Sequence, residues 1–299
     1  MKKFWGSVAM VTATVIWGMA FSAQSKGMEF VDPMLFSAMR SATALLSLAV
    51  VVAVIDLVRC RRVSLWGDAR TPQQKKELVT GGIWCGVILA AASVFQQFGL
   101  LYTSAGKTGF LTALYIVIVP VLGVFFKRKT SFVMWLAVVM GLSGAYLLCG
   151  GIGNIGLGEW LVIICALLYS FHILVIDRYA AQCDCVRLST VQFAVTAAVT
   201  LLAALIFSRD WQWEKISGAL PFWLFCGIGS SAIAFTLQMV AQKYLHPVTA
   251  TLLMSLESVF AVLGGWIFLG EVMSPREFSG CAVIFMAIII SQLNFRGNS

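Results

Sequence analysis

Long apolar runs separated by short polar segments follow one another along the whole chain. A membrane's hydrocarbon core is about 30 Å thick and a helix rises about 1.5 Å per residue, so roughly 20 apolar residues make one crossing. By this measure the sequence predicts ten membrane-spanning helices. Their expected ranges are 5–25, 34–56, 78–101, 107–126, 131–149, 157–178, 188–207, 219–242, 247–269 and 274–294.

Prolines add detail to this pattern. Proline is tolerated in the first turn of a helix, where its missing N–H would have no partner. Pro33, Pro221, Pro247 and Pro275 each fall at the beginning of a predicted span. Pro120 lies well inside the fourth span, where it removes a backbone hydrogen bond and predicts a kink or break.

Composition supports a lipid environment. The chain is 60% hydrophobic and 11% charged, against about 45–50% and about 25% in ordinary soluble domains. A net charge of +8 would suggest nucleic acid as the partner of a soluble protein. Here the basic residues gather in the gaps between apolar runs, so we expect a bilayer and no nucleic-acid partner. The fold class expected is an all-α membrane protein.

The placement of basic residues predicts the orientation of the chain. Of the 21 Lys and Arg residues, 15 fall in gaps on the side of the N-terminus, 5 fall on the opposite side, and Arg40 lies within a span. Cytoplasmic loops carry such an excess of Lys and Arg. We therefore expect a multi-pass protein of the bacterial inner (plasma) membrane with both termini in the cytoplasm.

The chain also shows weak internal similarity. A shift of 152 residues places Trp17 on Tyr169 and Arg40 on Gln192. A shift near 138 places 114–121 over 252–259, and it is shorter because only the first half carries the basic insert around 59–77. Residues 1–149 and 150–299 each hold five predicted spans, an odd number, so the second half must be inverted. Inverted repeats are typical of transporters that open alternately to each side of the membrane.

Several motifs resemble a known family. They are Trp17-Gly18-Met19-Ala20-Phe21, Pro33 with Arg40, Pro120, Leu256-Glu257-Ser258-Val259-Phe260-Ala261 and Leu269-Gly270-Glu271. The chain resembles the ten-helix, EamA-type members of the drug/metabolite transporter superfamily. In that family the residue after the first Glu is usually Pro, whereas here it is Ser258. The resemblance implies a secondary transporter, often an exporter, of amino acids, nucleosides, drugs or related metabolites, with the substrate held between the halves.

Charged groups within spans are the first candidates for function, because a charge near the bilayer centre is costly. Glu257 lies ten residues into its span, near the midplane. It is either a proton site or partner of a cationic substrate group, or a structural carboxylate beside Ser255 and Ser258. Arg40 either binds a substrate carboxylate or anchors its helix at the outer membrane face.

Aromatic and uncharged polar residues complete the set of candidates. Trp17 and Phe21, four residues apart, either stack on a substrate or pack against a neighbouring helix. His172 shares a helix face with Cys165 and Tyr169, and it is either a ligand or proton relay or one end of an interhelical hydrogen bond. The remaining residues predict a cavity that binds neutral or zwitterionic molecules through hydrogen bonds: Gln96, Gln97, Gln192, Gln238 and Tyr115.

Other classes of protein find less support. The eight cysteines are scattered, and Cys183-Asp184-Cys185 has no further Cys or His cluster to complete a metal site. Two histidines and isolated acids assemble no catalytic group, and no phosphate-binding Gly-Lys-Ser/Thr loop occurs. We expect a small-molecule transporter without cofactor or metal. An intramembrane enzyme and a non-transporting receptor or scaffold are the alternatives, and a homodimer is left open.

Overall fold

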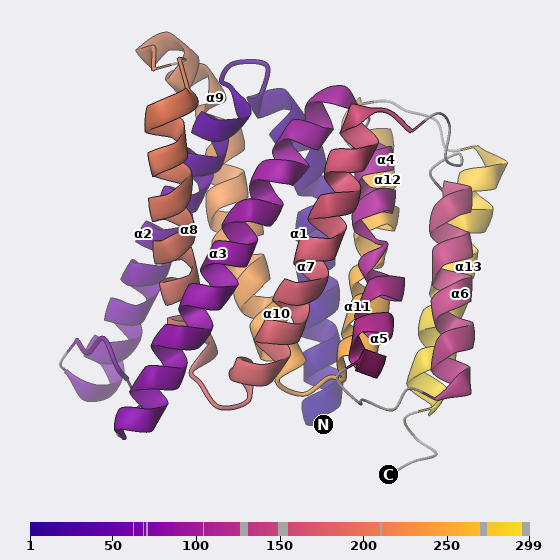
Figure 1. Cartoon of the computed structure of the whole chain (residues 1–299), viewed down its shortest axis with the longest axis horizontal. Helices are drawn as coiled ribbons and strands as arrows, with labels where there is room; N and C mark the ends of the chain where they lie inside the picture. The colour runs from indigo at the N-terminus through magenta and orange to yellow at the C-terminus, as the bar shows by residue number, and fades with distance from the viewer. Residues whose placement is uncertain are drawn as a thin grey trace.

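All secondary structure in the described part of the chain is helical (Figure 1). The computed structural model describes residues 1–61, 63–67, 69, 71–103, 105–125, 131–148, 155–209, 211–269 and 274–294. The Gly270-Glu271 part of the family-like motif lies outside these residues. The elements are α1 (Lys2–Gly27), α2 (Pro33–Cys60), α3 (Pro72–Tyr102), α4 (Ala105–Thr112), α5 (Tyr115–Phe125), α6 (Phe132–Leu148), α7 (Leu157–Ala180), α8 (Cys185–Phe207), α9 (Trp213–Phe225), the π-helix η1 (Cys226–Ala234), α10 (Phe235–Gln242), α11 (Pro247–Met254), α12 (Leu256–Leu269) and α13 (Pro275–Asn294).

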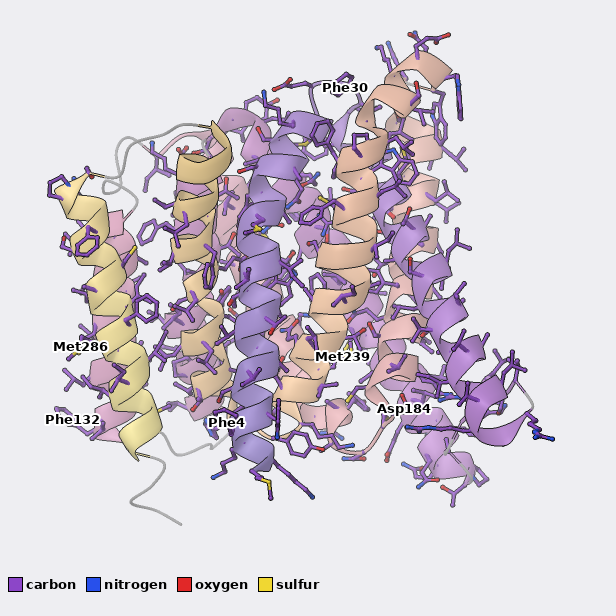
Figure 2. All side chains as sticks on the ribbon, turned by 180° about the vertical axis from the view of Figure 1, so that it is seen from behind. Phe4, Phe30, Phe132, Asp184, Met239 and Met286 are labelled. Carbon is purple, nitrogen blue, oxygen red and sulfur yellow. The ribbon has the colours of Figure 1, made fainter. Side chains whose placement is uncertain are left out.

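The ten predicted crossings are present among these residues. Seven stretches are long and apolar enough to cross a membrane, including α4 with α5 as Lys107–Phe125 and α9 with η1 and α10 as Trp213–Gln242. Three shorter apolar stretches supply the others, at Phe132–Leu147, Pro247–Leu263 and Phe278–Ile290. Large apolar side chains such as Phe4, Phe132 and Met286 point outward from the bundle (Figure 2). The chain is a multi-pass membrane protein whose outer surface suits lipid.

The two halves are inverted repeats. The helix α1 begins on what we call the N-terminal side of the bundle, whereas α7, the first helix of the second half, begins on the opposite side (Figure 1). Contacts also occur in exchanged pairs: α1 packs against the α9–η1–α10 span, as α7 packs against α3. The second helices, α2 and α8, pack on each other, and so do α6 and α13. A two-fold axis in the membrane plane produces this pattern.

Helix caps fix the correspondence between the halves. Asp32 caps α2 by accepting hydrogen bonds from Met34 N and Leu35 N, and Asp184 caps α8 in the same way through Val186 N and Arg187 N. These caps lie 152 residues apart, which agrees with the predicted shift. The helices α4 and α11 instead correspond at 142, because Ala105 and Thr112 match Pro247 and Met254. The predicted shift of 138 was therefore wrong by four residues, about one helical turn.

The fourth and ninth spans are both broken near mid-membrane. The fourth divides between Thr112 and Tyr115, where the Ile116 and Val117 amides bond to carbonyls three residues back. Pro120 lies inside the continuous helix α5, more than one turn after this break, so the span breaks earlier than the predicted position at Pro120.

The ninth span is broken without a proline. It divides at Ser255, whose hydroxyl donates to Leu252 O at 2.7 Å. A serine hydroxyl that bonds to the backbone competes with regular helical hydrogen bonds. The Ser258 amide bonds to Ser255 O, again three residues back, at 3.2 Å. Serine thus accompanies the break in a span whose family-like motif lacks the usual proline.

Helix beginnings depart from the apolar runs at two places. Pro33, Pro247 and Pro275 begin their helices as predicted. Pro221 is wrongly placed at a beginning, since it is the ninth residue of α9, which begins at Trp213. Likewise α3 begins at Pro72, ahead of its apolar run, where Thr71 and Gln74 form a capping box. Hydropathy marks only the lipid-embedded part of a helix, and these two helices extend beyond it into polar sequence.

Candidate functional site

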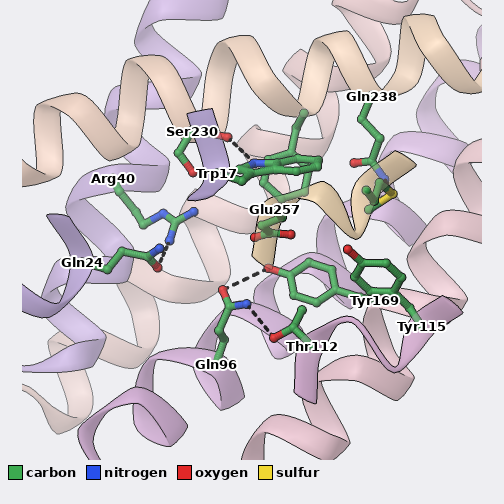
Figure 3. Close-up of a pocket in the computed structure, with 12 residues that line it drawn as sticks. Trp17, Gln24, Arg40, Gln96, Thr112, Tyr115, Tyr169, Ser230, Gln238 and Glu257 are labelled. Atoms are coloured by element: carbon green, nitrogen blue, oxygen red, sulfur yellow. Dashed lines mark hydrogen bonds between the residues drawn. The ribbon is translucent and has the colours of Figure 1, made fainter. Parts of the chain in front are cut away.

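A cavity lies between the halves at the level of the two helix breaks (Figure 3). Its empty space is about 410 Å³, counted together with its open end. The lining residues are Trp17, Gln24, Arg40, Gln96, Thr112, Tyr115, Tyr169, Ser230, Phe235, Gln238, Met254 and Glu257. They come from both halves, as the inverted-repeat architecture requires.

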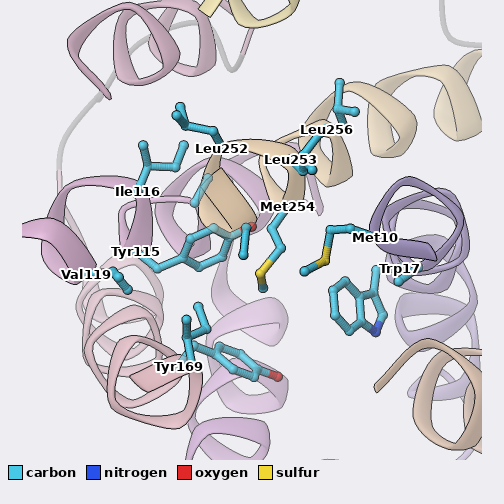
Figure 4. Close-up of a cluster of buried hydrophobic side chains, with 14 of the residues drawn as sticks. Met10, Trp17, Tyr115, Ile116, Val119, Tyr169, Leu252, Leu253, Met254 and Leu256 are labelled. Atoms are coloured by element: carbon cyan, nitrogen blue, oxygen red, sulfur yellow. The ribbon is translucent and has the colours of Figure 1, made fainter. Parts of the chain in front are cut away.

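The broken helices bring four of these residues to the cavity. Thr112 ends α4 and Tyr115 begins α5, while Met254 ends α11 and Glu257 lies in the first turn of α12. The 142-residue correspondence pairs Tyr115 with Glu257 across the two-fold axis. Apolar neighbours such as Ile116 and Leu253 pack around the breaks and hold the helix ends in place (Figure 4).

Two charged residues face this cavity. Glu257 is 9% exposed and Arg40 is 4% exposed. Arg40 Nη1 donates to Gln24 Oε1 at 2.7 Å, and Arg40 Nε donates to Ser231 Oγ at 3.2 Å. This inward, buried placement favours a cavity role for Arg40 over an anchor at the membrane face. No ion pair joins Arg40 and Glu257 in the described structure, so neither neutralises the other.

Uncharged polar groups form a second part of the lining. Tyr169 OH donates to Gln96 Oε1, and Gln96 Nε2 donates to Thr112 Oγ1, each at 3.4 Å. Gln238 Oε1 is buried and finds no hydrogen-bond partner in the part of the chain that the structure describes, and the buried Tyr115 OH meets the side chain of Glu257, which also lines the cavity. Because buried polar atoms are nearly always paired, Gln238 Oε1 leaves hydrogen-bonding capacity for a bound molecule or water.

Aromatic rings form one wall of the cavity. Trp17 Nε1 donates to Ser230 O at 3.0 Å, and its ring meets Phe235 edge-on with centroids 5.1 Å apart. Ser230 lies within η1, and π-helical segments frequently occur at functional sites. Gly18 allows this close approach of α1, since a Cβ there would lie 2.5 Å from Phe260 Cβ.

Four predicted cavity residues lie outside the cavity lining, and one of them, Gln97, contacts Met28 Sδ at 3.5 Å. Phe21 is 1% exposed, and its ring lies near Gly109 of α4 instead of beside Trp17. His172 Nε2 and Gln192 Oε1 are 2.8 Å apart and join α7 to α8. The His172 ring packs edge-on against Phe235, which lines the cavity. The sequence predicted correctly that these residues lie in helices beside the cavity. The way the helices pack, however, turns their side chains toward a neighbouring helix and away from the cavity.

Five lining residues were not predicted from the sequence. Gln24 could have been predicted in the same way as Gln96, because it is an amide side chain within an apolar run. Thr112 and Ser230 are weaker indications of a cavity, because hydroxyl side chains in membrane helices often bond to the backbone of their own helix. Phe235 and Met254 are apolar residues in apolar runs. Only the packing reveals that they line a cavity.

Metal binding finds no support in the described residues. No group of three or more His, Cys, Asp and Glu side chains is placed to hold an ion there. Cys183, in the segment between α7 and α8, is a buried free thiol. Burial, with a smaller contribution from the negative charge of Glu77, raises the pKa of Cys183 to about 11. This thiol therefore stays protonated at neutral pH.

Comparisons with known proteins agree with this architecture. The family model described as the EamA-like transporter family matches residues 4–150 and again 156–293. An Archaeoglobus fulgidus protein described as an uncharacterized transporter is 25% identical over 98% of this chain and 87% of its own length. The threonine/homoserine exporter RhtA of Escherichia coli K12 is 34% identical over 36% of this chain and 38% of its own length. A solved crystal structure has the same fold, with a TM-score of 0.76, 20% identity, and coverage of 98% of this chain and 99% of that one.

Proposed function

This chain belongs to the EamA-like transporter family, and we propose from that membership that it exports small zwitterionic metabolites by alternating access. The proposed membrane is the bacterial inner membrane, with both termini in the cytoplasm. Residues 1–149 and 150–299 are the proposed repeats, which exchange conformations and so expose the cavity to one side and then the other. Inverted repeats support this mechanism because each half can adopt the conformation of its partner.

The observation that carries the substrate class is the presence of an arginine and a glutamate in one cavity. Arg40 and Glu257 both line it and do not pair with each other among the described residues. Arg40 is bonded to the neutral side chains of Gln24 and Ser231, and a buried charge without a counter-charge is costly. A molecule carrying both a carboxylate and an ammonium group satisfies both residues at once: Arg40 binds the carboxylate and Glu257 the ammonium.

The rest of the lining supports polar, modest-sized substrates. Gln238 Oε1 supplies a free hydrogen-bonding group, Tyr115 OH lies beside Glu257, and Gln96 lies between Tyr169 and Thr112. Trp17 and Phe235 present an aromatic wall for the apolar part of a substrate. The first class to test is the amino acids, since RhtA, which matches part of this chain, is named an exporter of threonine and homoserine.

Transport by the purified protein in liposomes tests the proposal. Amino acids, nucleosides and cationic drugs are loaded inside, and their loss is followed. We expect neutral amino acids to move, and Arg40→Gln and Glu257→Gln each to abolish that movement. Glu159→Gln is the matched control, because Glu159 is a buried carboxylate that lies outside the cavity and bonds to Thr103 Oγ1 at 2.9 Å.

Three outcomes would contradict the proposal. If nucleosides or drugs move and amino acids do not, the zwitterionic class is wrong although the transporter stands. If nothing moves while a covalently changed product appears, the protein is an intramembrane enzyme instead. If transport survives both Arg40→Gln and Glu257→Gln, these two residues do not bind the substrate.

A further inference from the structure

The paired helices α2 and α8 carry contacts at both ends that join the two halves. They run antiparallel and are related by the two-fold axis, so the capping residue of each lies beside the far end of the other. At the opposite side of the bundle, the capping residue Asp32 accepts a hydrogen bond from the hydroxyl of Ser208. At the N-terminal side, the capping residue Asp184 belongs to a larger group of contacts around Arg187 (Figure 2).

Arg187 joins three segments at the N-terminal side. Its guanidinium forms ion pairs with Asp56 of α2 and, at 3.2 Å, with Asp184. It also donates to the Ser64 carbonyl at 3.3 Å, and Ser64 N donates to Asp56 Oδ2 at 2.8 Å. The Arg187 and Asp56 side chains are 6% and 8% exposed. This is a buried charge pair between the first and second halves.

Residues 63–67, between α2 and α3, cover this pair. Gly67 has φ +53°, a left-handed conformation that favours glycine, and it lies directly on the guanidinium. A Cβ at this position would lie 2.2 Å from Arg187 Cζ. Any larger residue would therefore have to displace either these residues or the guanidinium.

The two ends differ at symmetry-related positions. With the shift of 152, Asp32 corresponds to Asp184, Leu35 to Arg187, and Asp56 to Ser208. The opposite side thus has a leucine where the N-terminal side has an arginine, and a serine where it has an aspartate. Within the described chain, no ion pair joins α2 and α8 at the opposite side. The joint at the N-terminal side is an ion pair between a guanidinium and carboxylates, whereas the joint at the opposite side is a hydrogen bond from a neutral hydroxyl to a carboxylate, so the two joints are unequal.

We propose that the Asp56–Arg187 pair is a latch that holds the two halves together on the N-terminal side and must break whenever the cavity opens to that side. Arg187 is in this sense a positioning residue: it contacts no substrate and sets which side opens. The inference rests on the proposed alternating access. Its consequence is a resting protein closed on the N-terminal side, because opening there separates charges, whereas opening at the other side separates α2 from α8 at a weaker joint.

Side-specific labelling of the cavity tests the latch without any substrate. The reporter is Thr112→Cys in a chain whose eight native cysteines are replaced by alanine. A membrane-impermeant maleimide is applied from each side in turn. We expect Asp56→Asn and Arg187→Gln to raise labelling from the N-terminal side by roughly fivefold or more and to lower it from the other side. Ser208→Ala, the symmetry-related control, should give no rise from the N-terminal side.

Further variants separate a latch from a structural contact. The exchanged pair Asp56→Arg with Arg187→Asp should restore the wild-type labelling ratio in part, because the attraction is regained. Gly67→Ala disturbs the guanidinium without changing charge and should shift labelling in the same direction as Arg187→Gln. If Arg187→Gln does not fold, the labelling of Gly67→Ala decides whether the Asp56–Arg187 pair is a latch.

Unchanged labelling from both sides in these variants, or an equal rise from both sides, would overturn the latch. The second result would mean general loosening of the bundle. A shifted labelling ratio in a protein that moves none of the tested metabolites would instead count against the proposed function alone.

Discussion

The indole of Trp17 is hydrogen-bonded to the carbonyl oxygen of Ser230 at 3.0 Å, so the first helix of one half is fixed to the π-helix of the other. The bond lies in the cavity wall, where both residues line the space. A change of cavity shape must therefore either keep this contact or break it. Its strength influences both the stability of the fold and the movement of the halves.

Replacing Trp17 by phenylalanine removes this donor and keeps an aromatic wall. The Ser230 carbonyl loses a partner, so we expect the free energy of unfolding in detergent to fall by about 1 kcal/mol. Transport affinity should weaken roughly fivefold, which corresponds to a similar energy. Trp223→Phe is the control, because Trp223 bonds to Ile216 O at 3.4 Å within α9, away from the cavity. Equal losses in both variants would contradict a special role for Trp17.

Tyr115→Phe should separate binding from stability. In the described structure its buried hydroxyl meets the Glu257 side chain, which itself lines the cavity, so its removal takes a polar group from the binding site more than from the fold. We expect the melting temperature to change little, while affinity for a polar substrate falls roughly three- to tenfold. Tyr102→Phe, at the exposed end of α3, should change neither. A marked loss of stability in Tyr115→Phe would show that this contact stabilises the fold.

Neighbouring glutamines on α3 offer a matched pair. Gln96 lines the cavity and lies between Tyr169 and Thr112, whereas Gln97 contacts Met28 Sδ at 3.5 Å outside it. We expect Gln96→Leu to raise the KM for transport several-fold and Gln97→Leu to leave KM unchanged. Initial rates measured over a range of substrate concentrations decide between them. A similar rise of KM in both variants would mean that KM depends on the overall polarity of α3 and not on the contact of Gln96 with the cavity.

His172 and Gln192 should act on stability and not on transport. Their side chains bond to each other at 2.8 Å and lie outside the cavity lining. In a double-mutant cycle of His172→Phe and Gln192→Leu, we expect a coupling of about 0.6 kcal/mol and no more than about 1.7 kcal/mol. The transport rate of folded variants should remain near that of the wild type. Loss of transport with unchanged stability would instead identify His172 as a proton relay.

Alkylation of Cys183 should show an unusual pH profile. Since burial raises the pKa of Cys183 to about 11, the protonated thiol dominates at neutral pH and the reactive thiolate increases with pH up to that value. We expect the iodoacetamide rate, followed by mass spectrometry, to rise about tenfold per pH unit between pH 9 and 10. A surface thiol with a pKa of about 8.5 would level off over this range. A plateau near pH 9 for Cys183 would contradict its burial.

The sequence alone determined the ten crossings, because insertion of a helix into the bilayer depends on the hydropathy of about 20 consecutive residues, which is a local property of the chain. The odd number of spans in each half then required the inversion. The sequence also predicted most of the polar cavity lining, including Arg40, Gln96 and Glu257. A charged or amide group inside an apolar run must turn toward protein or water, wherever its neighbours lie.

Only the tertiary structure decided how each helix is rotated and where it breaks. Trp17 and Phe21 look equivalent in the sequence, yet one lines the cavity and the other packs near Gly109, because α12 and η1 approach α1 from different directions. The break at Ser255 and the pairing of Asp56 with Arg187 likewise depend on segments far apart in the chain. Packing between helices is a non-local interaction. It determines which face of an apolar helix points toward the cavity, and hydropathy alone does not distinguish these faces.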